Sequence, residues 1–388
     1  MEEKQLSINN EENFVRMRFG RSYAGKEVKA PEGIEKREWG FGSLNRKIES
    51  RHFKFASQQE LNSYLVRNTP FFISYSTAYY EFPDMRPMEK KNWIGADLVF
   101  DLDSNHLEVG CSKKHEQRWV CDECLGAVRE ETIKLIEEFL IPDFGFSRAE
   151  IKVNFSGNRG YHVHIANRAV MELGAYARRE IVDFVTGIGI DSESIGFRKE
   201  RIGDSKMQKL VGPKPSDMGW FGKVARFVIK LANENKLEEL GLDQVDARKI
   251  YKNREQFVKG IERGNWDVVS IPHKQMVWSS AIDRLKIKLS DKIDQNVTAD
   301  ATKLIRLPDS LHGETGLVAK RVEDINGFNP LKDAIAFGSE PLKIKVNKIN
   351  RFKINEQEFG PFENESVELP EYAAMYLICK REASLWKS

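Results

Sequence analysis

Residues 96–103 of the chain read ADLVFDLD, an apolar stretch that carries three aspartates. A β-strand places alternate residues on opposite faces. The apolar face would hold Leu98, Phe100 and Leu102, and the opposite face would hold Asp97, Val99, Asp101 and Asp103. Because strands disfavour aspartate and like charges on one face repel, two interpretations remain. The carboxylates lie in water on a solvated face, or they bind a divalent metal ion.

The composition is typical of a globular protein and does not indicate which ligand or partner it binds. Its 388 residues are 40% hydrophobic and 31% charged, which suffices for two domains or for one large domain with an insertion. The 61 basic and 59 acidic residues nearly cancel, so net charge identifies no ligand. No apolar run of about 18 residues predicts a membrane span. The polar N-terminus lacks the order of a secretory signal, so we expect a cytoplasmic protein.

One segment departs from this balance. Residues 197–230 contain nine lysines and arginines but only three acids, with Trp220 and Phe221 between them. Basic residues interleaved with aromatic ones are typical of a contact with a phosphate backbone. The same composition fits a solvated loop beside a helix, and both interpretations stay open.

The periodicity predicts a mixed α/β fold. Residues 151–156 (IKVNFS) and 161–166 (YHVHIA) alternate in polarity and are separated by GNRG, which predicts a β-hairpin. Residues 129–140 have helical spacing, and the region 170–290 is richer in helical patterns than the rest. For residues 293–313 we expect a turn, a helix capped by Thr298 and ended by Pro308, and a loop.

A cysteine-rich loop follows the acidic strand. Its spacing is Cys111-x3-His115-x5-Cys121-x2-Cys124, and the loop has too few apolar residues to form a core. Zinc takes four tetrahedral nitrogen or sulfur ligands, and a C-x2-C pair supplies two of them. We therefore predict a structural zinc site, in which His106 is an alternative to His115; the other interpretation is that the cysteines are free surface thiols. A four-thiolate iron–sulfur cluster would need one more cysteine.

The acidic strand suits a different metal. Carboxylates at positions i and i+2 can hold one or two hard cations such as Mg²⁺. Two such ions about 4 Å apart support nucleotidyl transfer, which also requires a third acid and cations for a triphosphate. Asp294 and Asp300 are candidates for the acid. Candidates for phosphate contacts are Arg159 and the Gly-rich turn around it, His162, Arg306 and His312.

Several of these motifs together resemble one family. FDLD, the Cys/His loop, SGNRGYH, IDQNVT and SLHGETGL occur in the order found in the small, catalytic subunit of archaeal and eukaryotic-type DNA primases. The segments REWGF, RHFKF, SYSTAYYE and GWFGKVAR resemble its archaeal branch. The resemblance runs from about residue 37 to residue 318. It implies synthesis of short primers on single-stranded DNA from ribonucleotides, and often from deoxynucleotides, together with a primase large subunit.

The resemblance also assigns roles to residues. The family's DxD metal pair matches Asp101 and Asp103, and its third acid lies 18 positions before the SLH histidine, which selects Asp294 over Asp300. These carboxylates would bind Mg²⁺ or Mn²⁺. The nucleotide-contacting positions match Ser156, Arg159, His162, Arg306 and His312, with Glu38 and Arg51 in motifs close to the nucleotide. The zinc knuckle matches Cys111, His115, Cys121 and Cys124.

The resemblance further implies an architecture. We expect a catalytic α/β domain whose central sheet carries the acids, built from residues 1–190, with the zinc knuckle at 106–125, and from residues 286–388. Residues 191–285 would form a smaller, mostly helical insertion.

At one position the chain departs from the family. Family members often have lysine two positions after the SLH histidine, whereas this chain has Glu314. We expect Glu314 to face solvent or to pair with Lys320 or Arg321.

Two other functions are consistent with these motifs. A related primase-polymerase or repair polymerase would have nearly the same site. A zinc-containing nucleic-acid-binding protein without catalysis would use its acids only for structure.

Overall fold

The computed structural model describes residues 2–107, 111, 116, 118–202, 207–287 and 298–386, with side chains for all of these except 2–9 and 106. It confirms a mixed α/β fold. The chain forms two compact units, which are described separately. Unit 1 comprises residues 1–133, 147–179 and 289–388, and unit 2 comprises residues 134–146 and 180–288. Within the described ranges, no helix has the length and apolar character to cross a membrane.

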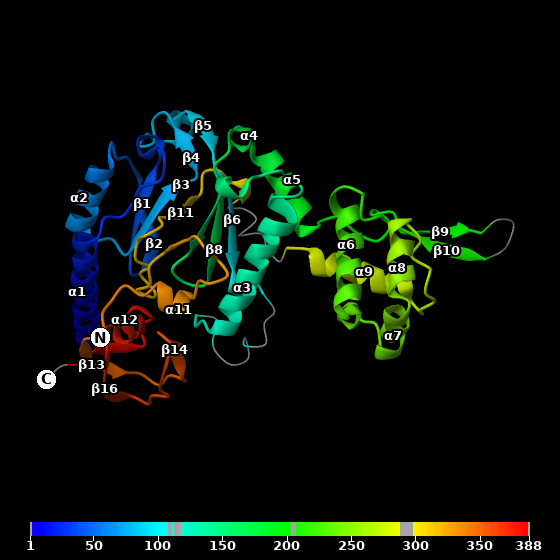
Figure 1. Ribbon diagram of the computed structural model, residues 1–388. Helices are drawn as coiled ribbons and strands as arrows, with labels where there is room; N and C mark the ends of the chain where they lie inside the picture. Colours follow the sequence, from blue (N-terminus) through cyan, green and yellow to red (C-terminus); the bar gives the residue numbers. More distant parts are fainter. Residues whose placement is uncertain are drawn as a thin grey trace. The chain divides into compact units, whose positions relative to one another are not determined.

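The acidic stretch lies at the edge of a four-stranded sheet in unit 1 (Figure 1). The strand order is β12 (Arg321–Val322), β7 (Ile151–Phe155), β8 (Gly160–Ile165) and β6 (Leu98–Asp103). The hairpin predicted at residues 151–166 is confirmed as β7 and β8. One face of this sheet is apolar and buried, because Phe100 and Val163 are both 0% exposed. Phe328 packs on that face, against Phe155 and Tyr161.

A second four-stranded sheet in unit 1 has the order β11 (Leu304–Arg306), β3 (Phe72–Ser76), β1 (Trp39–Ser43) and β2 (Arg46–Phe53). Helix α2 (Gln58–Asn68) is capped by Ser57, whose side chain accepts a hydrogen bond from the amide of Glu60, and it buries Leu61 and Leu65. The short hairpin of β4 (Ala78–Tyr80) and β5 (Trp93–Ala96) leads directly into β6.

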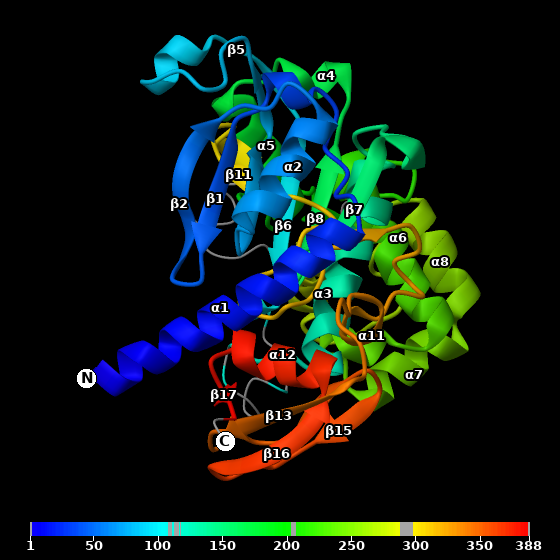
Figure 2. The same ribbon diagram turned by 90° about the vertical axis from the view of Figure 1, so that its left-hand side faces the viewer.

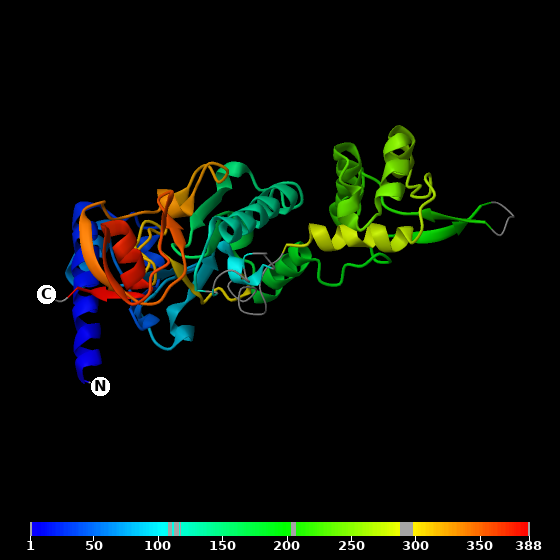
Figure 3. The ribbon, with the colours of Figure 1, turned by 90° about the horizontal axis from the view of Figure 1, so that it is seen from below.

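The two ends of the chain lie together in unit 1. Helix α1 (Glu2–Gly25) contacts α12 (Glu371–Cys379) and β17 (Ala383–Leu385), as Figure 2 shows. The helix and the C-terminal strands lie on the same side of unit 1 (Figure 3). The strands near the C-terminus are β13 (Pro341–Val346), β14 (Phe352–Ile354), β15 (Gln357–Phe359) and β16 (Glu365–Pro370). The remaining helices that begin in this unit are α3 (Asp122–Lys134), α4 (Arg168–Met171), α5 (Ala175–Thr186) and α11 (Pro330–Asp333).

Unit 2 is mostly helical. It contains α6 (Gly219–Glu234), α7 (Gln244–Lys252), α8 (Arg254–Glu262), α9 (Lys274–Leu285) and the hairpin β9 (Arg198–Arg201) and β10 (Gln208–Val211). Within the basic segment, Trp220 is 3% exposed, so its ring belongs to the core and cannot stack on a base. Lys223 is also buried and pairs with Asp143 at 2.8 Å. Among the described residues of the segment, the exposed cations are Arg198, Lys199 and Arg201 on β9, Lys214, and Arg226 and Lys230 on α6.

Two sequence predictions about elements need correction. The helix expected before Pro308 is wrong at Leu304–Arg306, because these residues form β11 and pair with β3. Ile305 is 4% exposed, and its burial between strands outweighs the helical pattern. The helix expected at 129–140 begins earlier, at Asp122, and continues as a π-helical turn at Leu135–Leu140.

A buried ion pair joins the second sheet to the start of β6. Arg37 Nη2 lies 2.6 Å from Asp97 Oδ2, and the two side chains are 2% and 7% exposed. Arg37 Nη1 also donates to the carbonyl of Ser76 at 2.8 Å. Asp97 is therefore the buried counter-ion of Arg37. This structural role distinguishes it from the other two aspartates of the stretch.

We predict that Arg37→Ala lowers the free energy of unfolding by about 3–5 kcal/mol, because it leaves the buried Asp97 carboxylate without its counter-charge. Urea denaturation measures this loss. The matched control is Arg351→Ala, whose pair with Glu358 is 68% and 60% exposed and which we expect to change stability by less than about 1 kcal/mol. Equal effects of the two substitutions would contradict a structural role of the Arg37–Asp97 pair.

Candidate active site

The register of β6 and β8 brings acids and a histidine to one face. Asp101 is paired with His162 and Asp103 with Gly160. Leu98, Phe100 and Leu102 are at most 1% exposed on the apolar face. Asp101 and Asp103 are half-buried on the other. The alternation expected from the sequence is therefore confirmed.

Both carboxylates lie near nitrogen atoms of the β7–β8 hairpin. His162 Nε2 is 3.5 Å from Asp101 Oδ1. Arg159 Nε is 3.4 Å from Asp103 Oδ2. The amide of Asn105 donates to Asp103 Oδ1 at 2.9 Å, which orients that carboxylate.

The turn between β7 and β8 is organised by a serine. Ser156 Oγ accepts hydrogen bonds from the amides of Asn158 (3.3 Å) and Gly160 (3.2 Å). Gly157 has φ +83°, and a Cβ atom there would lie 2.8 Å from Cβ of His312. Only glycine permits this approach. The hydroxyl of Thr315 donates to the carbonyl of Gly157 at 2.6 Å, so the SGNRG turn and the SLHG loop are packed together.

Arg306 and His312 reach the same neighbourhood from the other sheet. Arg306 lies at the end of β11, with its guanidinium 4.7 Å from the centroid of the Phe72 ring. The ring of His312 meets the same Phe72 edge-on at 5.2 Å. Nη1 of Arg306 is buried and has no hydrogen-bond partner among the described residues. A buried donor without a partner is unfavourable, so this guanidinium is suited to an anionic ligand.

The histidines of the site are uncharged. Burial, and then the charge of Arg306, lowers the pKa of His162 to about 3. The same two causes lower the pKa of His312 well below its usual value. Burial also lowers the pKa of Arg306, to about 10, so the arginine remains charged at neutral pH.

Glu314 has a partner that the sequence did not predict. Asn158 Nδ2 donates to its carboxylate at 3.3 Å. The expected pairing with Lys320 or Arg321 is wrong, because Lys320 Nζ donates to the carbonyl of Asp333 and Arg321 pairs with Asp309. The alternative, a side chain that faces solvent, holds only in part, because Glu314 is half-buried. Glu314 therefore lies against the SGNRG turn.

Glu38 and Arg51 form a second cluster. Arg51 Nε and Nη2 contact the two oxygens of Glu38 at 2.7 and 3.0 Å, and Glu38 is 0% exposed. Arg51 also donates to the carbonyl of Thr302 at 3.3 Å. The sequence analysis missed Lys91, whose fully buried Nζ lies 3.4 Å from Glu38. Nothing in the local pattern of residues 88–92 marks this lysine as buried.

The third acid lies outside the part of the chain that the structure describes. That part resumes at Thr298, whose hydroxyl donates to the carbonyl of Val99 on the open edge of β6 at 2.7 Å. Asp300 is occupied in a turn, because its Oδ1 accepts from the amide and the hydroxyl of Thr302. The chain is thus attached to the acidic strand at Thr298.

Three cysteines converge in the predicted zinc loop. The sulfur atoms of Cys111, Cys121 and Cys124 all lie within 4.8 Å of one another. Three thiols at this separation fit the ligand geometry of a zinc ion. His115 and the side chain of His106 are outside the described residues, so the choice between them stays a prediction.

The buried, neutral His162 gives a prediction about pH. Below pH 6.5 the unfolded chain binds a proton at this histidine that the folded chain does not, down to a pH of about 3. The variant His162→Gln has no titratable group at this position, so neither its folded nor its unfolded state binds a proton there. Between about pH 6 and pH 4 we expect the free energy of unfolding of the wild-type protein to fall, relative to the variant, by about 1.4 kcal/mol per pH unit. Urea denaturation at several pH values measures both curves, and parallel curves would contradict the prediction.

Comparisons with known proteins identify the family. A family model described as DNA primase small subunit matches residues 100–324. The chain is similar to proteins named DNA primase small subunit PriS from Methanothrix thermoacetophila (36% identical over 95% of this chain and 97% of the relative) and Methanococcoides burtonii (35%, 95% and 97%). A third is from Archaeoglobus fulgidus (35%, 96% and 98%). The chain with its paired aspartates, Gly-rich turn and cysteine cluster therefore belongs to the DNA primase small subunit family.

Proposed function

We propose that unit 1 is the catalytic unit of a primase that makes short primers on single-stranded DNA by template-directed nucleotidyl transfer. The observation that carries the proposal is the register of Asp101 with His162, beside Arg159, Arg306 and His312. The carboxylates that would bind hard cations then lie close to the side chains that would bind phosphate. Ribonucleoside triphosphates are the expected substrates. Analysis of the products decides whether deoxynucleotides are incorporated as well.

The donor set fits divalent cations of the kind that the family uses. Asp101 and Asp103 offer carboxylate oxygens two positions apart on one strand, with the neutral His162 at 3.5 Å from the first and Arg159 at 3.4 Å from the second. Mg²⁺ and Mn²⁺ prefer oxygen ligands of this type. Two such ions, when bound, would activate the attacking hydroxyl and stabilise the leaving pyrophosphate.

Asp294 is the proposed third ligand. It precedes Thr298 by four residues, and four residues of chain span at most about 14 Å. Because Thr298 is held against β6 by its hydrogen bond to Val99, this length allows the Asp294 carboxylate to approach Asp101 and Asp103.

The residues around the acids divide the work of binding a triphosphate. Arg306, with its buried and unpartnered Nη1, and Arg159 supply positive charge. His312 Nδ1 accepts from the amide of Glu314 at 3.2 Å, so a neutral His312 carries its proton on Nε2 and can donate it to a phosphate oxygen. The neutral histidines thus contribute hydrogen bonds, while the arginines contribute the charge. Glu38 and Arg51 are proposed to lie close to the nucleotide.

We propose structural zinc for the cysteine cluster, since the three thiols and one histidine would leave no open coordination position. Unit 2 is proposed as a helical insertion into the catalytic unit. A primase large subunit is the proposed partner, as the family resemblance implies.

We predict that Asp101→Asn, Asp103→Asn and Asp294→Asn each reduce nucleotide addition to a few percent or less of the wild-type rate, because positioned charge cannot be replaced by an amide. The matched control is Asp300→Asn, whose carboxylate is engaged in a turn and whose loss should leave the rate within about threefold.

The assay supplies single-stranded template, nucleoside triphosphates and Mn²⁺ or Mg²⁺ without a primer, and circular dichroism verifies folding. Synthesis without a primer separates a primase from a repair polymerase. Activity in Asp294→Asn, or its loss in Asp300→Asn alone, would overturn the assignment of the third acid.

We also predict one zinc ion per chain by elemental analysis. Cys121→Ser should lose the zinc, because two thiols and one histidine do not complete a tetrahedral site. His115→Ala and His106→Ala decide the fourth ligand, and we expect only the first to lower zinc content. Retention of zinc in Cys121→Ser would contradict the site.

A further inference from the structure

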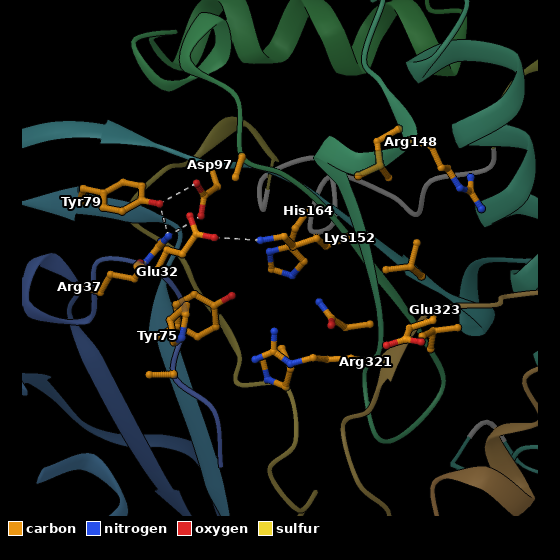
Figure 4. A pocket seen from close by; sticks show the side chains of 18 residues that line it. Glu32, Arg37, Tyr75, Tyr79, Asp97, Arg148, Lys152, His164, Arg321 and Glu323 are labelled. Carbon is orange, nitrogen blue, oxygen red and sulfur yellow. Dashed lines mark hydrogen bonds and ion pairs between the residues drawn. The ribbon is translucent and has the colours of Figure 1, made fainter. Parts of the chain in front are cut away.

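A cavity of about 510 Å³ lies in unit 1 beside the beginning of β6, with Asp97 in its lining (Figure 4). Residues of both four-stranded sheets line it, among them Tyr75 from β3, Lys152 and Asn154 from β7, His164 from β8 and Arg321 from β12. None of the acids or phosphate-contacting residues of the candidate active site belongs to this lining. The volume is within the range of pockets that bind small molecules.

Among the residues that line this cavity, His164 has a buried polar atom that a ligand could satisfy. The residue is 7% exposed, and its Nε2 atom has no hydrogen-bond partner among the described residues. Burial lowers its pKa well below the usual value, so the ring is neutral. A buried polar atom without a partner costs about 1–3 kcal/mol, which a hydrogen-bonding ligand would recover.

One wall of the cavity suits a planar ring. The rings of Tyr75 and His164 are nearly parallel, at 14°, with centroids 6.5 Å apart. Arg37 lies over the ring of Tyr79 at 3.9 Å. The Asp97 carboxylate on this side is already bound by Arg37 and by the hydroxyl of Tyr79, so this wall offers aromatic and hydrogen-bonding surface without an unpaired charge.

Three cationic side chains also line the cavity: Arg148, Lys152 and Arg321. Arg321 pairs with Asp309 at 2.9 Å, and the acids Glu32 and Glu323 belong to the lining as well. Lys152 pairs with Glu32 at 3.2 Å, but the two side chains are 54% and 79% exposed. An ion pair this exposed contributes little and can open at low cost. Opening this pair frees the Lys152 ammonium to contact a ligand, so the part of the cavity at Lys152 suits a group with one or two negative charges, such as a phosphate monoester.

We propose that this cavity is a second nucleotide site, which binds a nucleoside monophosphate with its base against Tyr75 and His164 and its phosphate at Lys152 and Arg321. The site is separate from the triphosphate site at Arg159 and Arg306.

The cavity is also connected to the acids through two histidines. The rings of His164 and His162 meet edge-on at 6.2 Å, and His162 Nε2 lies 3.5 Å from Asp101 Oδ1. A ligand that contacts His164 would therefore alter the surroundings of His162. On the basis of the proposed function, we expect the bound monophosphate to change the rate of nucleotide addition without competing with the triphosphate.

Isothermal titration of the full chain with AMP tests the site. EDTA is present, so that binding through catalytic cations is excluded. We expect one AMP per chain, with adenosine alone and inorganic phosphate alone each at least tenfold weaker. Lys152→Ala and His164→Leu should each weaken AMP binding by about tenfold, the loss of one strong hydrogen bond. Lys353→Ala, an exposed lysine paired with Asp122, and Arg306→Ala should bind AMP as the wild type does.

Absence of AMP binding at millimolar concentration would overturn the proposal. So would equal affinity for inorganic phosphate, or binding that is lost in Arg306→Ala and kept in His164→Leu, which would place AMP in the triphosphate site. Circular dichroism verifies that His164→Leu is folded, and Lys152→Ala, at an exposed side chain, tests the site independently of any folding defect. These titrations require no catalysis, so they fail or succeed regardless of the proposed function. In the activity assay, AMP should then change kcat in the wild type and not in Lys152→Ala.

Discussion

The antiparallel pairing of β6 with β8 is the constraint on which the candidate site depends. A strand has two faces, and here Leu98, Phe100 and Leu102 occupy the buried one. A shift of one residue in this register would bury Asp101 and Asp103 and expose the apolar side chains, so the core itself holds the acids in place. The same pairing sets Asp101 opposite His162 and Asp103 opposite Gly160. The groups proposed to bind metal and phosphate therefore share one rigid support.

Close backbone packing extends this support to residues far away in the chain. Gly157 allows the loop with His312 to approach the turn with Arg159, and Thr315 ties the two together. Phe72 of the other sheet contacts both Arg306 and His312. The resulting surroundings are dry enough to keep His162 and His312 neutral while Arg306 stays charged. Positive charge at the site thus comes from arginine, whose intrinsic basicity survives burial.

The three aspartates of the opening stretch have different fates. Asp97 neutralises Arg37 in a buried pair that connects the two sheets, whereas Asp101 and Asp103 remain half-buried, the first beside the neutral His162 and the second beside Arg159. Along the polar face of β6, the first aspartate therefore stabilises the fold, whereas the last two are available for binding a ligand. His164 lies between these two parts of the face and contributes neither to the Arg37–Asp97 pair nor to the candidate active site. Its unpartnered Nε2 atom and the cavity beside it are the features that favour a second ligand.

The sequence by itself determined the alternation of β6, the β7–β8 hairpin, the cysteine cluster and the family, because these depend on local periodicity and on short spacings. It could not determine that Leu304–Arg306 is a strand, that Asp97 is paired with Arg37, or that Lys91 lies buried beside Glu38. Nor could it select Asn158 as the partner of Glu314. Each of these depends on which distant segments meet, and only the tertiary structure decides that, since burial and ion pairing act between residues that the chain order does not bring together.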